Sequence, residues 1–120
     1  MSVSRKHREL RVWQDSIRLV KNVYLSTEAF PKHEVYGLTS QMRRAAVSVA
    51  TNIAEGSARI GRKELLHFLS IARGSLSELD TLTEISMTLG YLNDGDTLQS
   101  EINQVAGLLA RLRTSLSKPD

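Results

Sequence analysis

The sequence predicts an all-α protein, an antiparallel up-down-up-down four-helix bundle. Apolar residues recur at steps of three and four over four long segments, and these cover about residues 9–27, 34–56, 62–89 and 96–116. Pro or Gly residues stand in the connections between them, and the connections are short. Short connections favour antiparallel neighbours, which is the arrangement of a simple bundle.

The 120 residues fit a single domain with a core of its own. We expect the bundle to span about residues 9–118 and a basic, frayed tail to occupy residues 1–8. In the first helix the apolar residues step alternately by three and four, as in a heptad seam, so this face should be buried: Leu10, Trp13, Ile17, Val20 and Tyr24. Trp13 is then a core anchor, and a platform for stacking a base is the alternative.

The second helix carries two stripes side by side. Its apolar stripe is Leu38, Met42, Ala45, Val49 and Ile53. A polar stripe at the same spacing consists of Gln41, Arg44, Ser48, Asn52 and Glu55. The helix begins either near Glu34, with an irregular turn at Gly37, or at the capping residues Thr39 or Ser40. Gly56 is suited to a left-handed exit from the helix.

The third helix offers partners for that polar stripe in Arg73, Ser75 and Glu78. Because an unpaired buried polar group costs about 1–3 kcal/mol, the stripe should form a network within or between subunits. A groove for a ligand or nucleic acid is the alternative. The main apolar stripe runs along Leu65, Leu69, Ala72, Leu76, Leu79, Leu82 and Ile85. Gly74 in mid-helix predicts the close approach of a neighbouring helix.

The fourth helix repeats the seam spacing and should end near Pro119. Its apolar residues are Leu98, Ile102, Val105, Leu109, Leu112 and Leu116. Gly90 is a plausible cap for the preceding helix. Arg111 and Arg113 favour the negative end of the helix dipole.

Composition argues against several function classes. The chain has no Cys, and its three His residues form no metal-binding pair, so we expect no metal and no cofactor. No nucleophile elbow, P-loop or dinucleotide fingerprint is present, so we expect no enzyme. No segment approaches the roughly 18 apolar residues of a membrane span, and no signal peptide is evident. A cytoplasmic protein without membrane contact is the expectation.

The charge is unevenly distributed along the chain. Residues 1–63 hold 12 Lys or Arg against 5 Asp or Glu, whereas residues 64–120 hold 4 against 8. Such asymmetry indicates either a basic face for nucleic acid or attraction between the two halves. One basic cluster lies at the start of the first helix: Arg5, Lys6, Arg8 and Arg11. Another follows the second helix: Arg59, Arg62 and Lys63. An antiparallel bundle should merge the two clusters, and Arg43 should be a further exposed cation. Solvated surface charge is the alternative.

Three stretches resemble a known family: LRVWQDSIRLVKNVY, FPKHEVYGLTSQMRRAAVSVATNIAEGSAR and KELLHFLSIARGSLSELDT. They are similar to proteins linked to intervening sequences of bacterial 23S ribosomal RNA genes, also called S23 ribosomal proteins. The similarity covers about residues 9–116. It is most specific in YGLTSQ, RRA, S-x-x-x-N-x-x-E-G and ARGSLSEL.

The resemblance implies a four-helix bundle that assembles into ring-like homopentamers. It also implies a distant kinship with accessory proteins of diversity-generating retroelements, which bind nucleic acid. No catalytic residues are defined for the family. Relatives often have proline where this chain has Ala50, which makes a kink in the second helix unexpected here. The predicted function is therefore a non-enzymatic oligomer that binds RNA or DNA through a basic surface. The alternative is a ring-forming structural or adaptor protein that binds another protein.

Overall fold

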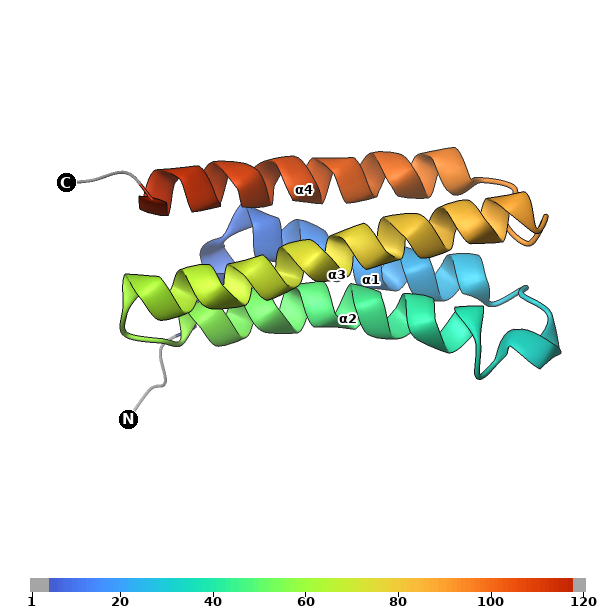
Figure 1. Ribbon diagram of the computed structural model, residues 1–120, viewed down its shortest axis with the longest axis horizontal. Coiled ribbons are helices and arrows are strands. Elements are labelled where there is room, and N and C mark those ends of the chain that lie inside the picture. Colours follow the sequence, from blue (N-terminus) through green and yellow to red (C-terminus); the bar gives the residue numbers. More distant parts are fainter. Residues whose placement is uncertain (1–4, 118–120) are drawn as a thin grey trace.

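The computed structural model describes residues 5–117, which form four long helices: α1 (Arg11–Thr27), α2 (Leu38–Ser57), α3 (Arg62–Thr88) and α4 (Gly95–Ser117). Two short 3-10 helices precede the first pair, η1 (Lys6–Glu9) and η2 (Lys32–Glu34). No strand occurs within the described residues. Successive helices run antiparallel and pack side by side, and α4 returns beside α1 to close the bundle (Figure 1). The predicted fold class is confirmed.

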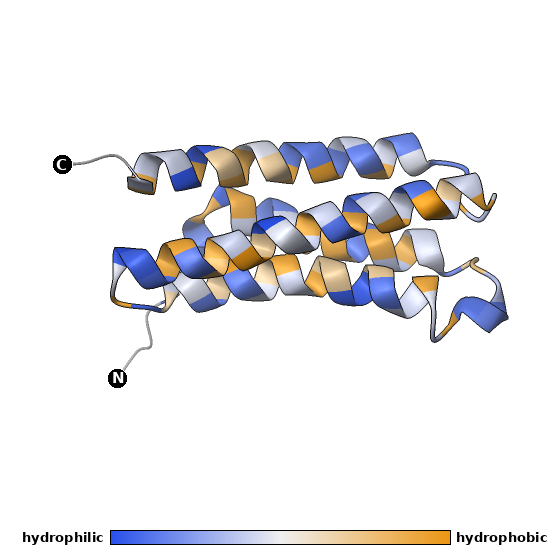
Figure 2. Cartoon of the chain, viewed as in Figure 1, coloured by the Kyte–Doolittle hydropathy of each residue, from blue (hydrophilic) through white to orange (hydrophobic). Residues whose placement is uncertain are grey.

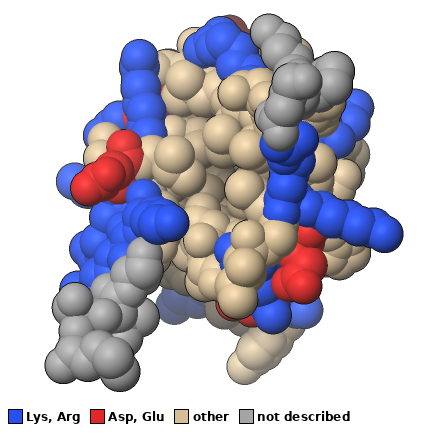
Figure 3. Space-filling view, turned by 90° about the vertical axis from the view of Figure 1, so that its left-hand side faces the viewer, with Lys and Arg blue, Asp and Glu red and all other residues tan. Residues whose placement is uncertain are grey.

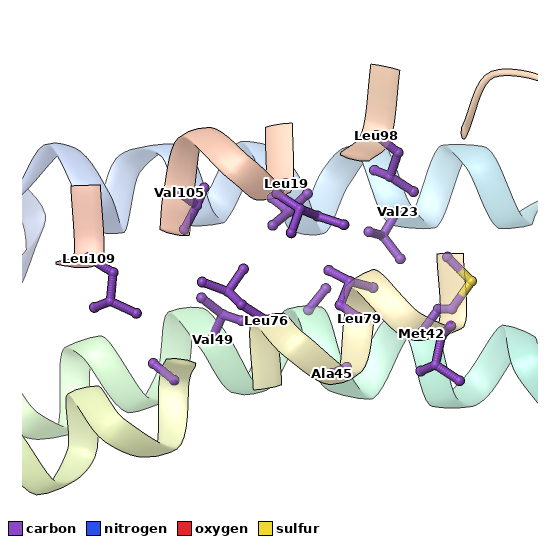
Figure 4. Packing of buried hydrophobic residues seen from close by; sticks show 14 of the residues in the cluster. Leu19, Val23, Met42, Ala45, Val49, Leu76, Leu79, Leu98, Val105 and Leu109 are labelled. Atoms are coloured by element: carbon purple, nitrogen blue, oxygen red, sulfur yellow. The ribbon is translucent and has the colours of Figure 1, made fainter. Parts of the chain in front are cut away.

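All four helices supply side chains to one core. Figure 4 shows Leu19, Val49, Leu76 and Val105, one from each helix, meeting in the centre. Each is at most 3% exposed. Burying an aliphatic side chain of this kind contributes about 1.5–3 kcal/mol, so this central layer supplies much of the stability.

The predicted apolar stripes of α2 and α4 and most of that of α3 face this core. All five stripe residues of α2 are buried, and in α4 the first four are buried while Leu112 and Leu116 are half-buried. In α3 the exception is Ile85, which is exposed, while Ser86 takes the buried position. Figure 2 shows hydrophobic and hydrophilic residues alternating along each helix, as such stripes require.

The predicted face of α1 is partly confirmed, because Leu10, Trp13 and Val20 are half-buried and pack against the core, but the fully buried stripe lies about one residue away. Ile17 and Tyr24 are 43% and 42% exposed, whereas the buried positions are Val12, Asp15, Ser16, Leu19, Val23 and Thr27. This second stripe has the same spacing but contains polar residues. They are tolerated because the hydroxyls donate to carbonyls of their own helix, Ser16 to Trp13 at 2.6 Å and Thr27 to Val23 at 2.8 Å.

The buried Asp15 is also provided with partners. Arg18 donates to its carboxylate from the next turn, Gln104 of α4 donates at 3.2 Å, and Arg11 lies 3.8 Å away. A carboxylate with these donors can replace an apolar residue at the buried edge of α1. The periodicity of apolar residues favours the more apolar stripe of α1, so it does not predict the buried stripe that contains polar residues.

Both helix starts differ in detail from the sequence prediction. The α1 helix begins at Arg11, two residues later than expected, because residues 6–9 form η1. The tail predicted over residues 1–8 is therefore ordered from Arg5 onward. Residues 1–4 and the last residue of the predicted bundle, Lys118, lie outside the described residues. The α2 helix begins at Leu38 after an irregular turn, and the Glu34 carboxylate accepts a hydrogen bond from its first amide at 3.1 Å.

Two glycines differ from the sequence prediction: Gly56 has the close-packing role expected of Gly74, and Gly74 has neither predicted role. Gly56 lies within α2 and does not have a left-handed conformation; a Cβ there would lie 2.9 Å from the Cβ of Phe68, so it permits close packing of α2 on α3. Gly74 has open space around it within the described chain, so the predicted helix approach is absent there. Gly90, with φ of 79°, caps α3 as predicted.

Candidate nucleic-acid interface

The antiparallel topology collects basic residues from four parts of the chain at one end of the bundle. This end, here called the basic end, holds η1, the start of α1, the α2–α3 connection and the last turns of α4. Its cations are Arg5, Lys6, Arg8, Arg11, Arg59, Arg62, Lys63, Arg111 and Arg113. All are exposed except Arg113, which is half-buried. The predicted merging of the two clusters therefore occurs.

Figure 3 shows this end face directly. Lys and Arg side chains stand at its left, top and right, around a centre of uncharged residues. Ile60, in the α2–α3 connection, is fully exposed. Acidic residues at this end are fewer, namely Glu9, Glu55 and Glu64. The balance gives the face a positive potential, as phosphate binding requires.

The cations of the basic end differ in how firmly they are held. Arg59 pairs with Glu55 at 2.5 Å, lies 3.9 Å from Glu64 and stacks over Phe68 at 4.9 Å. Arg8 lies over the Trp13 ring at 5.6 Å. These contacts hold the two side chains against the bundle.

Other cations there have no such restraint. Lys6, Lys63 and Arg111 form no ion pair with any of residues 5–117. Unpaired, exposed cations retain their full charge for a partner. They are therefore the basic-end residues most available for phosphate contacts.

Arg43 does not belong to this face. It lies near the start of α2, in the other half of the bundle, and donates to the Thr27 hydroxyl at 2.9 Å and to the Tyr24 carbonyl at 3.3 Å. Its guanidinium also covers the Tyr24 ring at 4.5 Å. Arg43 thus fastens α2 to the end of α1, and the prediction of an exposed, available cation is wrong for it.

Arg111 and Arg113 also lie at the basic end, although the sequence predicted for them only a favourable interaction with the dipole of the fourth helix. Their position follows from topology, because α4 ends where α1 begins. The signal that could have found them was the predicted up-down-up-down order itself. At the opposite end the acids outnumber the cations: Glu28, Glu34, Glu84, Asp94 and Asp96 lie there with the exposed Lys32 and with Arg43, which is bound to the end of α1. Charge is therefore separated between the two ends of the bundle.

The polar stripe of α2 is only partly paired within the subunit. The Ser48 and Ser75 hydroxyls are 2.8 Å apart, and the Asn52 amide donates to the Ser48 carbonyl at 2.8 Å and to its hydroxyl at 3.0 Å. Glu55 pairs with Arg59 of its own helix end. The structure thus brings together Ser48, Asn52 and Ser75.

The remaining stripe residues are exposed. The side chains of Gln41 and Arg44, and that of Glu78 on α3, have no hydrogen-bond or ion-pair partner among residues 5–117. Together with Tyr36, Ser40, Ala45, Ser48 and Ser75 they line a shallow groove of about 530 Å³ between α2 and α3. Arg73 lies apart from them, on the α3–α4 side.

Residues 5–117 contain neither a cluster of metal-binding side chains nor a helix suited to crossing a membrane. No three His, Asp or Glu side chains gather there in an arrangement that could hold a metal ion. None of the described helices combines the length and apolarity needed to cross a membrane.

Known proteins identify the family. The model of the 23S rRNA-intervening sequence protein family matches residues 8–111. The fold is also that of a protein of unknown function from the S23 ribosomal protein family of Bacteroides thetaiotaomicron VPI-5482. Its crystal structure matches with a TM-score of 0.79 at 17% identity, covering 86% of this chain and 95% of that one. No curated protein matches the chain. The protein therefore belongs to the 23S rRNA-intervening sequence protein family.

Proposed function

We propose that this protein is a cytoplasmic, non-enzymatic, oligomeric four-helix bundle that binds nucleic acid, and specifically RNA, through its basic end. The observation that carries this proposal is the gathering of cations from four separate segments on one end face. Phosphate binding needs several cations within reach of one backbone, and this face provides them. The acidic opposite end would repel a nucleic acid, which fixes the orientation of binding.

The experiment compares two double variants of equal charge. Lys63→Gln with Arg111→Gln removes two unpaired cations of the basic end. Lys21→Gln with Lys32→Gln removes two exposed cations elsewhere. In a gel-shift assay at low salt with a structured RNA, the first variant should bind about tenfold or more weakly, and the second should bind as the wild type does. Equal binding by all three proteins, or none by the wild type, refutes the proposal.

We also propose that the chain assembles with copies of itself, as the resemblance implies, through the α2–α3 face. Support comes from Arg44 and Glu78, which carry opposite charges and lack partners among residues 5–117. The same face contains Gly74, whose open surroundings would admit a neighbouring helix. A network between subunits would complete the pairing that the single subunit leaves open.

Charge exchange tests this assembly. Light scattering should give a mass of several copies of the 13.4 kDa chain, five if the resemblance holds. Glu78→Arg should lower the mass, and adding Arg44→Glu should restore it, because the pair is then complementary again. A monomeric wild type, or a mass unaffected by Glu78→Arg, refutes the proposed interface.

A structural or adaptor role is the second candidate, and the exposed apolar strip on α1 and α2 favours it. Ile17, Tyr24 and Val47 are each at least 37% exposed on that side. Such strips mark contacts with proteins more often than with nucleic acid. Capture of a protein from cell extract that survives nuclease treatment and is lost with Ile17→Ser would support this role, provided that RNA binding is absent.

A further inference from the structure

A groove of about 810 Å³ runs between α3 and α4 on the side away from the polar stripe. Its volume lies in the range of small-molecule sites. Its floor consists of the core side chains Leu76, Ile102 and Leu109, each at most 3% exposed. The groove thus has an apolar base and reaches down to the packed interior.

The groove exists because α4 presents small residues to it. Ala106 and Ala110 line it where larger side chains would close the space between the two helices. Both alanines are exposed. The two helices also diverge toward the end that carries the C-terminus (Figure 1). This opening is therefore set by the sequence of α4 and not by a missing core residue.

The two ends of the groove carry charged residues of opposite sign. Arg73 and Arg113 line the part nearer the basic end. Asp80 and Asn103 line the other part, and Asp80 lies two helical turns, about 10 Å, from Arg73 along α3. The apolar floor lies between them. The groove therefore has a cationic end, an apolar middle and an end with acceptors.

Both arginines line the groove without an ion-pair partner among residues 5–117. The Nε of Arg113 is buried and has no hydrogen-bond partner within the described chain. Arg73 is exposed and forms no ion pair with residues 5–117. A buried guanidinium nitrogen without an acceptor is costly, so an incoming oxygen ligand would be favoured there.

We propose that this groove is a binding site for a small amphipathic carboxylate. Its carboxylate accepts hydrogen bonds from Arg73 and Arg113, because guanidinium groups match the planar geometry of a carboxylate. Its aliphatic or aromatic body lies on Leu76, Ile102 and Leu109. Asp80 disfavours a second anionic group at the far end and would accept a hydroxyl or amine there.

The test uses decanoate as the probe and calorimetric titration as the measurement. Decanoate should bind the wild-type protein saturably with one molecule per chain. Decan-1-ol and decyltrimethylammonium have the same chain length without the carboxylate, and each should bind at least about tenfold more weakly. Absence of saturable decanoate binding, or equal binding of the three probes, overturns the proposal.

Three variants locate the site. Arg73→Gln and Arg113→Gln should each weaken decanoate binding about tenfold, while Lys21→Gln should not change it. Ala110→Leu should fill the groove and abolish binding. Because Ala110 is exposed on a helix and leucine is a good helix former, the melting temperature should change little. If Arg113→Gln fails to fold, Arg73→Gln and Ala110→Leu still test whether decanoate binds in this groove.

Two results would assign the groove differently. Decanoate binding that is unchanged in Ala110→Leu places the ligand elsewhere and overturns the proposal. A change in the mass of Ala110→Leu by light scattering, together with no decanoate binding by the wild type, makes the groove an interface between copies and also overturns it. None of these readouts depends on nucleic-acid binding, so failure here leaves the proposed function open to its own test.

Discussion

The two ends of the bundle solve the same problem, how to turn the chain, in opposite ways. At the acidic end the rings of Phe30 and Tyr91 pack with centroids 5.7 Å apart, and His33 contacts the Tyr91 hydroxyl at 3.3 Å. At the basic end the α2–α3 connection carries Ile60 fully exposed. The acidic-end turn thus buries Phe30 in the bundle, although Tyr36 in the same connection is 93% exposed, whereas Ile60 of the basic-end turn is fully exposed.

Charge follows the same division. At the acidic end the Glu34 carboxylate caps α2 and lies 3.9 Å from His33. At the basic end Lys63 and Arg111 have no ionic partner among residues 5–117. Glu34 at one end is thus engaged in the fold, whereas Lys63 and Arg111 at the other end have no such contact within residues 5–117.

Substituting the apolar residue of each turn should give the largest contrast. Phe30→Ala should lower the free energy of unfolding by about 3–5 kcal/mol, because Phe30 is only 7% exposed and its removal leaves a cavity. Ile60→Ser should change stability by no more than about 0.5 kcal/mol. Urea unfolding of both variants measures the difference. Similar losses would mean that the two turns are equally packed.

The next contrast concerns two helix glycines. Gly56→Ala, at the basic end of α2, should destabilise by about 1–3 kcal/mol, because the new Cβ meets Phe68 and Leu65. Gly74→Ala should stabilise the subunit by about 0.5–1 kcal/mol, because the site is open and alanine favours the helix. Thermal melts at a protein concentration that keeps the chain monomeric separate the two. Destabilisation of the monomer by Gly74→Ala would contradict the open surroundings of this glycine within the subunit.

Two carboxylates near helix starts give a smaller contrast. Glu34→Ala should cost about 1 kcal/mol, since the amide of Leu38 loses its acceptor. Glu64→Ala, on an exposed first turn at the basic end, should cost no more than about 0.5 kcal/mol. Equal effects in chemical denaturation would remove the distinction between a half-buried capping carboxylate and an exposed, ion-paired one.

The smallest expected effect is a pH dependence at the acidic end. Desolvation by burial, and then the nearby Glu34 carboxylate, raise the pKa of Tyr91 above its ordinary value of 10.0. The folded state therefore holds the phenolic proton more tightly than the unfolded chain does. Its contribution to stability is full below pH 10.0 and is lost as the pH rises through the raised pKa. Tyr91→Phe should show a smaller fall in melting temperature between about pH 9 and about pH 11 than the wild type.

Much of the fold could be predicted because three helices carry one dominant stripe each. In α2 the predicted set from Leu38 to Ile53 is fully buried. The most buried face of α1 was not predicted, because Asp15, Ser16 and Thr27 are buried with partners that a count of apolar residues does not include. The Asp15–Gln104 bond joins residues 89 positions apart, which no local pattern reveals.

The candidate site shows the same limit. Seven of its cations could be predicted from two clusters in the sequence, and topology then added Arg111 and Arg113. Arg43 was misplaced because its partners, Thr27 and Tyr24, belong to another helix. The roles of Gly56 and Gly74 were predicted wrongly for the same reason, since only the packed helices show which glycine faces a neighbour.

The measurement that tests the central claim most directly is the salt dependence of RNA binding. Wild-type affinity should fall steeply as salt increases, with each phosphate contact adding about 0.7–0.9 to the slope of log affinity against log salt. Removing Lys63 and Arg111 as the double Gln variant should lower that slope by about two contacts' worth. The Lys21→Gln and Lys32→Gln control should keep the wild-type slope. Equal slopes for all three proteins would contradict the account.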